Sequence, residues 1–306
     1  MPTDPGSRPV PAGRPPRRAR RPGPARPSAA RERRRRRARR RAVLLVFAVA
    51  VGAVGWAATR SVIDTVRGEV CTITAAGTSE TFDPEQTGNA ALIAALSIKR
   101  RMPPRAATIA LTTAFQESKI RNLRFGDRDS LGLFQQRPSQ GWGTEAQVLD
   151  PVHATNAFYD ALVKFRGYET ADITQIAQRV QRSAYPDAYR DHEGQGRVLA
   201  STLTGNSPAG VTCGLRAATS HAAPATVRAA LAEQMGITAA TLGPGTLTVT
   251  AADTRLAWAV GHWAVAQAGS TGATQVRVGD RSWSRDRGAD GWSPGRASPT
   301  VTITLR

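Results

Sequence analysis

The sequence has few of the residues that build metal centres and nucleotide sites. It holds two cysteines, and its four histidines are widely separated at His153, His192, His221 and His262, a spacing that matches no metal site. It has neither a glycine-rich phosphate loop followed by Lys-Ser/Thr nor a Gly-x-Ser-x-Gly elbow. We therefore expect no metal ion and no cofactor.

Acidic residues are scarce at the N-terminus. Residues 1–41 carry sixteen arginines and two acids, Asp4 and Glu32, which gives +14 of the net charge of +19. Nine of the twenty prolines also lie here, so we expect a disordered cytoplasmic tail. We interpret it as a contact for the anionic lipid headgroups of a membrane. Nucleic-acid binding is the alternative, which we do not favour because the rest of the chain carries only +5.

Charge is absent from the next segment, residues 42–58, AVLLVFAVAVGAVGWAA. Its length is at the short end of what crosses the roughly 30 Å hydrocarbon core of a bilayer. We expect a transmembrane helix that acts as a signal-anchor, with the arginines cytoplasmic and the bulk of the chain extracytoplasmic. A cleaved signal peptide is the alternative. The expected localisation is therefore the cell membrane, with a single pass.

The two cysteines, Cys71 and Cys213, both follow this segment. An even pair in an oxidising compartment favours a disulfide. Closing a loop of this length would stabilise the fold by roughly 4–5 kcal/mol on the chain-entropy model. Two unrelated buried thiols are the alternative.

Hydrophobic periodicity predicts how the outer part is organised. Residues 59–85 are expected to be a linker, 86–204 an all-α domain, 205–222 a second linker, and 223–306 a small α/β domain of unknown role. The predicted fold class is thus a helical domain plus a small C-terminal α/β domain, preceded by the disordered tail and the transmembrane helix.

Glu117 lies near the C-terminal end of the helix expected over residues 105–118, at the edge of its apolar face. Burial and the negative end of the helix dipole both raise the pKa of a carboxyl group. A raised pKa suits a general acid for glycosidic cleavage. On geometry alone, a plain surface glutamate is the alternative.

Glu117 and Ser118, a polar loop, and then Gly132-Leu133-Phe134-Gln135 resemble the pattern of the lysozyme-like superfamily, in its lytic transglycosylase and goose-type lysozyme branch. That pattern is Glu-Ser, a loop, and Gly-Leu-Met-Gln. The resemblance covers about residues 86–204 and implies a lysozyme-like fold. It implies that Glu117 protonates the bond between N-acetylmuramic acid and N-acetylglucosamine in peptidoglycan. It then takes a proton from the 6-hydroxyl, which gives a 1,6-anhydro product.

The resemblance also implies contacts with the sugar. Gly132 would let the backbone approach it closely, and Gln135, with Gln136 as a weaker candidate, would hydrogen-bond its polar groups. Ser118 belongs to the same matched pattern and is a further binding candidate. Trp142 would either stack on a pyranose ring or pack within its loop.

The sequence departs from the family at two places. Asp129 and Ser130 replace Gly-Ala, and the Ala-Tyr-Asn box aligns near Ala184-Tyr185-Pro186, without its asparagine. Tyr185 remains a candidate for the tyrosine that touches the glutamate. Asp127 or Asp129 would permit hydrolysis through an activated water if one faced Glu117. Loop capping, or salt bridges to Arg124 and Arg128, is the alternative.

These features predict a membrane-anchored, peptidoglycan-cleaving envelope protein of actinobacterial type, whose partners are glycan strands and membrane lipids. A catalytically inactive peptidoglycan-binding or scaffold protein is the alternative, and the missing asparagine favours it.

Overall fold

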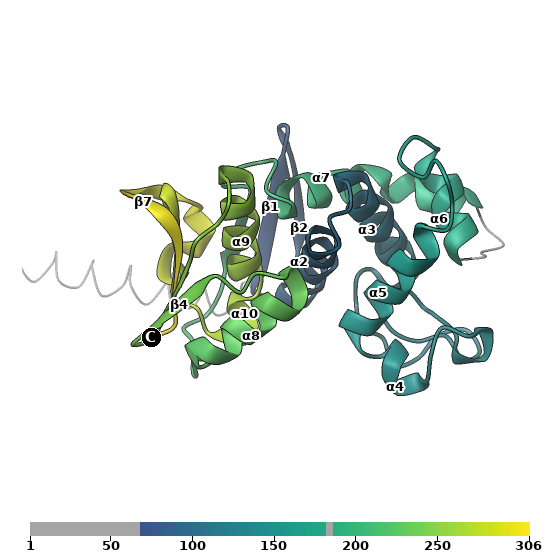
Figure 1. Cartoon of the computed structure of the whole chain (residues 1–306), viewed down its shortest axis with the longest axis horizontal. Helices are drawn as coiled ribbons and strands as arrows, with labels where there is room; N and C mark the ends of the chain where they lie inside the picture. The colour runs from purple at the N-terminus through teal and green to yellow at the C-terminus, as the bar shows by residue number, and fades with distance from the viewer. Residues whose placement is uncertain (1–67, 182–185) are drawn as a thin grey trace, which may run out of the picture. The chain divides into compact units, whose positions relative to one another are not determined.

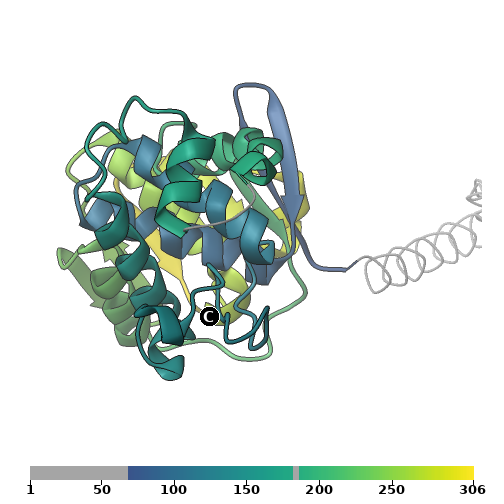
Figure 2. The ribbon, with the colours of Figure 1, turned by 90° about the vertical axis from the view of Figure 1, so that its right-hand side faces the viewer.

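The computed structural model describes residues 68–181 and 186–306. Within it, Glu69–Arg306 form one compact unit with its own hydrophobic core, so we expect this unit to fold without the preceding residues. Figures 1 and 2 show its elements from two sides. In chain order they are β1 (Val70–Ala75), β2 (Thr78–Phe82), α2 (Pro84–Lys99), α3 (Pro104–Ser118), η1 (Pro138–Gln140), α4 (Glu145–Val148), α5 (Pro151–Leu162), α6 (Ile173–Gln181), η2 (Pro186–His192), α7 (Glu193–Leu203), β3 (Val211–Gly214), α8 (Pro224–Met235), β4 (Ala240–Gly243), β5 (Thr246–Val249), α9 (Thr254–Ala266), α10 (Ala268–Thr271), β6 (Gln275–Ser284), η3 (Arg285–Asp290) and β7 (Ser293–Thr304).

Helix α2 is the central element of the unit. Its start is fixed by a capping box, in which the Asp83 side chain accepts the Gln86 N–H at 2.9 Å and the Gln86 side chain accepts the Asp83 N–H at 3.1 Å. Its residues 90–97 are buried on every side, as in a helix that is covered all round. Helices α3 and α5 pack against one side of α2, and α8 and α9 against another (Figure 1).

Helix α7 lies directly on α3. A Cβ atom at Gly196 of α7 would come within 2.1 Å of the Thr112 hydroxyl and 3.0 Å of the Thr108 carbonyl oxygen, both on α3. Only glycine permits this close approach of the two helices. Any larger residue at position 196 would push α7 away from α3.

Strand β1 is the middle strand of an antiparallel sheet with the order β2-β1-β3. Cys71 of β1 faces Cys213 of β3 in this register, and a disulfide joins them across a sequence separation of 142 residues. The predicted disulfide is therefore confirmed. Part of the segment that we expected to be a linker, 205–222, supplies β3 instead.

The second sheet is antiparallel, with the order β4-β5-β7-β6. Helix α9 packs against β6 and β7. Alternate residues of the strands are buried, as a sheet with one covered face requires. The buried residues at these positions are Leu247, Val249, Val276, Val278, Val301 and Ile303.

The predicted fold class is wrong. We expected an all-α domain followed by a separate α/β domain, but the described chain is an α+β fold with two antiparallel sheets. The two parts also share one core, since α2 packs against α8 and α9, and α7 packs against α9. Hydrophobic periodicity indicates which face of a helix is buried but not which element covers that face. The sequence therefore suggested a boundary between two domains, whereas the helices on either side of it pack together.

The described residues also contradict the expected membrane topology. In residues 68–181 and 186–306, no helix is long and apolar enough to cross a bilayer. The segment 42–58, on which the signal-anchor and the single-pass cell-membrane localisation depend, lies outside the described residues, as does the tail 1–41. An uncharged run at the lower limit of spanning length was a narrow basis for that localisation, and we do not retain it.

Replacing both cysteines, Cys71→Ala with Cys213→Ala, is expected to lower the free energy of unfolding by roughly 4–5 kcal/mol, because the unfolded chain regains the entropy of an open loop. Guanidinium unfolding of the wild type and the double variant measures the difference. Reduced wild type is the control and should approach the variant. Equal stability of the oxidised wild type and the variant would contradict the prediction.

His262 of α9 is a buried neutral group. Its Nδ1 lies 2.7 Å from the Thr202 carbonyl oxygen, to which it donates, and its Nε2 accepts the Gly210 N–H at 3.1 Å. Burial lowers the pKa of His262 to about 4, although the Thr202 carbonyl opposes this shift. The imidazole joins α9 to the end of α7 and, only while Nε2 is unprotonated, also to Gly210 just before β3.

Acid is therefore expected to destabilise the fold through His262. The unfolded chain binds the proton near pH 6.5, so this stabilisation is present above that pH and is lost as the pH falls towards 4. The loss is on the order of 3 kcal/mol. Urea unfolding across this pH range measures it, with His262→Gln as the control that removes the titrating group. A wild type and variant with the same pH dependence would refute the assignment.

Candidate active site

Helix α3 places Glu117 on its last turn. The helix starts with Pro104 in its first turn and ends where Lys119 and Ile120 adopt left-handed conformations, with φ of 54° and 60°. Residues 106–114 are buried, whereas Glu117 is only partly buried. The end of the helix therefore presents a carboxyl group at the margin of the core.

Ser118 connects the end of α3 to the following loop. Its buried hydroxyl donates to the Leu133 carbonyl oxygen at 2.7 Å, lies 3.1 Å from the Ala114 carbonyl oxygen, and accepts the Arg121 N–H at 3.2 Å. These contacts use its hydrogen-bonding capacity within the protein. The structure thus gives Ser118 a structural role, and its part in binding sugar stays a prediction.

Residues 131–136, which contain Gly132-Leu133-Phe134-Gln135, form a tight turn. Leu131 and Gln136 exchange backbone hydrogen bonds of 3.0 Å, and the Gly132 N–H donates to the Leu123 carbonyl oxygen at 2.7 Å. Gly132 has a φ of +76°, and a Cβ there would lie 2.5 Å from the Val148 carbonyl oxygen. The protein's own packing therefore requires this glycine.

Among the described residues, two side chains hydrogen-bond to the carboxyl group of Glu117. The hydroxyl of Tyr189, a buried residue of η2, donates to Glu117 Oε1 at 2.5 Å. A side-chain hydrogen bond with Gln181, the last residue of α6, also favours the ionised form. Burial favours the protonated form and outweighs the effect of the two hydrogen bonds, so the pKa of Glu117 is raised above its usual range.

Gln181 also fixes the turn beside Glu117. Its Nε2 donates to the Phe134 carbonyl oxygen at 2.5 Å. Together with the bond from Ser118 to Leu133, this brings the matched turn to the end of α3. The structure therefore brings together the two halves of the predicted pattern, Glu117 with Ser118 and the turn over residues 132–135.

Tyr185, the predicted tyrosine partner of Glu117, lies outside the described residues, so its contact stays a prediction. Within the described residues, Tyr189, four residues later, contacts Glu117. The Ala-Tyr-Asn motif of the family aligns with Tyr185, although its asparagine is missing here, so the sequence comparison pointed to Tyr185 and not to Tyr189. A search for any tyrosine after the helix that precedes this motif would have found both. No sequence motif indicated that Gln181 would contact Glu117.

The other predicted binding residues do not reach Glu117 with their side chains in the described structure. Gln136 is 1% exposed, and its Nε2 donates to the Ala154 carbonyl oxygen at 3.2 Å, so it faces the core. Gln135 folds back over its own turn, with Nε2 at 3.2 Å from the Gly132 carbonyl oxygen. Trp142 is half-buried and packs against the core.

Neither proposed second carboxylate contacts Glu117 in the described residues. Asp129 accepts from Arg137 Nε at 2.7 Å and from the Ser139 N–H at 2.8 Å. Arg137 holds the pKa of Asp129 well below its usual range. Asp127 is exposed on the loop. The alternative of salt bridging thus applies to Asp129, with Arg137 as its partner in place of Arg124 or Arg128.

Tyr189→Phe is expected to raise the pKa of Glu117 further, because it removes a donor that favours the carboxylate while keeping the ring. A carbon-13 NMR titration of the Glu117 carboxyl group measures this. Tyr159→Phe is the matched control, since the buried Tyr159 hydroxyl donates to the Ile93 carbonyl oxygen at 2.9 Å and should leave Glu117 unchanged. A lower or unchanged pKa in Tyr189→Phe would show that this hydrogen bond does not act on the carboxylate.

Comparison with known proteins does not place this chain in a family. No protein-family model matches it, and no curated protein matches it. The lysozyme-like resemblance therefore stays a prediction. The geometry around Glu117, with its raised pKa and its hydrogen bonds to Tyr189 and Gln181, is the basis for proposing a function.

Proposed function

We propose that this protein cleaves the glycan strands of peptidoglycan between N-acetylmuramic acid and N-acetylglucosamine, with Glu117 as the general acid. The observation that carries the proposal is a partly buried carboxyl group of raised pKa at the end of α3, hydrogen-bonded to Tyr189 and next to the Gly-Leu-Phe-Gln turn. A raised pKa increases the protonated fraction of a carboxyl group, which suits it to donate a proton to a glycosidic oxygen.

The contacts of Glu117 support proton transfer in both directions. Because the Tyr189 hydroxyl donates to Oε1, the acidic proton is expected on Oε2, which is then the atom that donates to the substrate. Once the proton has left, Tyr189 and Gln181 stabilise the carboxylate. Burial favours the acid and these donors favour the base, so one group can give a proton and take one back.

The position of the aspartates supports an internal nucleophile. Ordinary glycosidases use two carboxyl groups about 5–9.5 Å apart. Here Asp129 is engaged by Arg137 and Ser139, and Asp127 points to solvent. In the proposed reaction the 6-hydroxyl of the muramic acid attacks its own C1 and breaks the glycosidic bond. Glu117 takes up the hydroxyl proton, and the product is a 1,6-anhydro sugar.

A second candidate is a protein that binds peptidoglycan without cleaving it. The observation that favours it is the number of matched residues used internally: Ser118 and Gln136 bond to backbone carbonyls, and Gly132 packs against Val148. The missing asparagine after Tyr185 points the same way. Both candidates share the glycan ligand, so cleavage distinguishes them.

Fragment 69–306 is expected to release 1,6-anhydro muropeptides from purified peptidoglycan, and Glu117→Gln should reduce the rate by at least about a hundredfold, because it cannot donate a carboxylic proton. Mass spectrometry of the soluble products measures both. Asp129→Asn is the control and should keep most of the activity.

Two other outcomes of this assay would point to a different mechanism or function. Reducing ends derived from water would replace the internal nucleophile with hydrolysis. If wild type and Glu117→Gln release nothing, yet both sediment with peptidoglycan, the binding function is correct and the proposed cleavage is wrong.

A further inference from the structure

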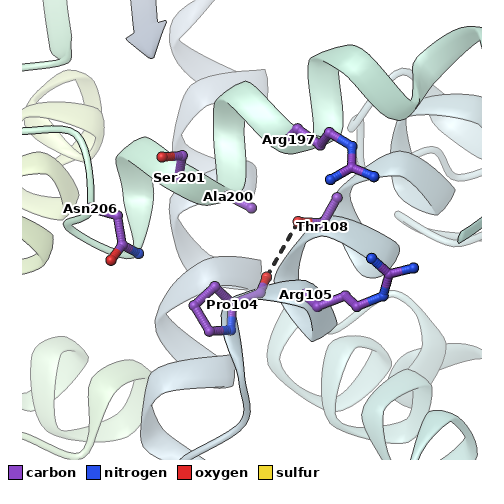
Figure 3. Close-up of a pocket in the computed structure, with 7 residues that line it drawn as sticks. All are labelled: Pro104, Arg105, Thr108, Arg197, Ala200, Ser201 and Asn206. Atoms are coloured by element: carbon purple, nitrogen blue, oxygen red, sulfur yellow. Dashed lines mark hydrogen bonds between the residues drawn. The ribbon is translucent and has the colours of Figure 1, made fainter. Parts of the chain in front are cut away.

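A hollow lies at the opposite end of α3 from Glu117. This pocket of about 390 Å³ is lined by Pro104, Arg105 and Thr108 of α3, by Arg197, Ala200 and Ser201 of α7, and by Asn206 just after α7 (Figure 3). Pro104 and Glu117 occupy opposite ends of one helix, about 20 Å apart at 1.5 Å per residue. The pocket is therefore separate from the candidate active site.

The lining of the pocket is positively charged. Arg105 and Arg197 supply two guanidinium groups, and no acidic side chain is among the lining residues. Arg105 donates through Nε to the Tyr168 carbonyl oxygen at 3.2 Å and through Nη2 to the Ala171 carbonyl oxygen. Both acceptors are neutral, so the charge of Arg105 has no counter-ion in these contacts.

Arg197 is only partly neutralised. Its Nε donates to Glu193 Oε1 at 2.8 Å, and its Nη2 donates to the same oxygen. The Arg197 side chain is 56% exposed, and in the described residues its Nη1 has no hydrogen-bond partner. A guanidinium group has donors on both terminal nitrogens, so Arg197 can hold Glu193 and still receive an oxyanion.

The two ends of the pocket carry different chemical groups. Figure 3 shows the guanidinium groups of Arg105 and Arg197 at one end, Ser201 and Asn206 at the other, and Pro104 with Ala200 between them. Asn206 uses its amide nitrogen to donate to the Thr204 hydroxyl at 2.8 Å, which leaves its carbonyl oxygen as an acceptor. A ligand with an oxyanion, a short apolar middle and an N–H group matches this order.

We propose that this pocket binds the C-terminus of a short peptide. The terminal carboxylate bonds to Arg105 and Arg197, a small side chain lies over Pro104 and Ala200, and the peptide N–H donates to the Asn206 carbonyl oxygen. The volume suits a ligand of two or three residues. The proposal does not depend on the function of Glu117.

Isothermal titration of fragment 69–306 tests the proposal, because the arginine-rich tail of the full chain would bind anions non-specifically. The probes are N-acetyl-Ala-Ala, its C-terminal amide, and inorganic phosphate. The acid is expected to bind about tenfold more tightly than the amide, since a charge-assisted hydrogen bond is lost with the carboxylate.

Variants assign the binding to this pocket. Arg197→Gln should weaken binding of the acid about tenfold, and Glu193→Gln should strengthen it, because it frees Arg197 from its competing carboxylate. Arg281→Gln is the matched control: Arg281 pairs with Asp280 at 3.8 Å on β6, away from the pocket, and should leave binding unchanged. Arg105 is not replaced in these variants, because its side chain donates to the backbone carbonyls of Tyr168 and Ala171 and its loss would disturb the fold there.

Three results would overturn the proposal: equal binding of acid and amide, unchanged binding in Arg197→Gln, or inorganic phosphate that binds more tightly than the peptide and displaces it. Binding of the acid that persists in Glu117→Gln supports a site separate from the active site.

Discussion

The candidate site depends on the removal of one carboxyl group from water. Glu117 stands where α3 leaves the core, and burial raises its pKa while Tyr189 and Gln181 pull it back. An exposed glutamate would be fully ionised at neutral pH and a poor acid. A fully buried one without donors would be a poor base after the transfer. A partly buried carboxyl group with hydrogen bonds from Tyr189 and Gln181 avoids both problems, and it can act first as the acid and then as the base.

The rest of the fold holds that carboxyl group in place. Ser118 and Gln181 fix the turn through the carbonyls of Leu133 and Phe134, so α3, the turn and α6 converge at one point. Helix α7 presses on α3 through Gly196, and α2 covers it from the core. The disulfide closes β1 onto β3, beside α7. Because α3 runs through this packing, one helix carries Glu117 at one end and the basic pocket at the other.

Local chemistry was predictable from the sequence, and long-range packing was not. The helix that ends at Ser118, the marginal burial of Glu117 and the disulfide all follow from periodicity or cysteine count. The pairing of β1 with β3 joins segments far apart in the chain, and β3 has only four residues, so it looked like linker. Gln136 resembled a binding residue because sequence does not report that its side chain turns inward to Ala154. Tyr189 was missed because a familiar pattern directed attention to Tyr185.

The pKa of Glu117 in the intact folded unit tests the central claim most directly. Carbon-13 NMR of fragment 69–306, with Glu117→Gln used to assign the resonance, follows this carboxyl group as the pH changes. We expect a pKa above the ordinary glutamate value of 4.5. A midpoint at or below that value would mean that solvent or hydrogen bonds dominate over burial, and the role of Glu117 as a general acid would then fail.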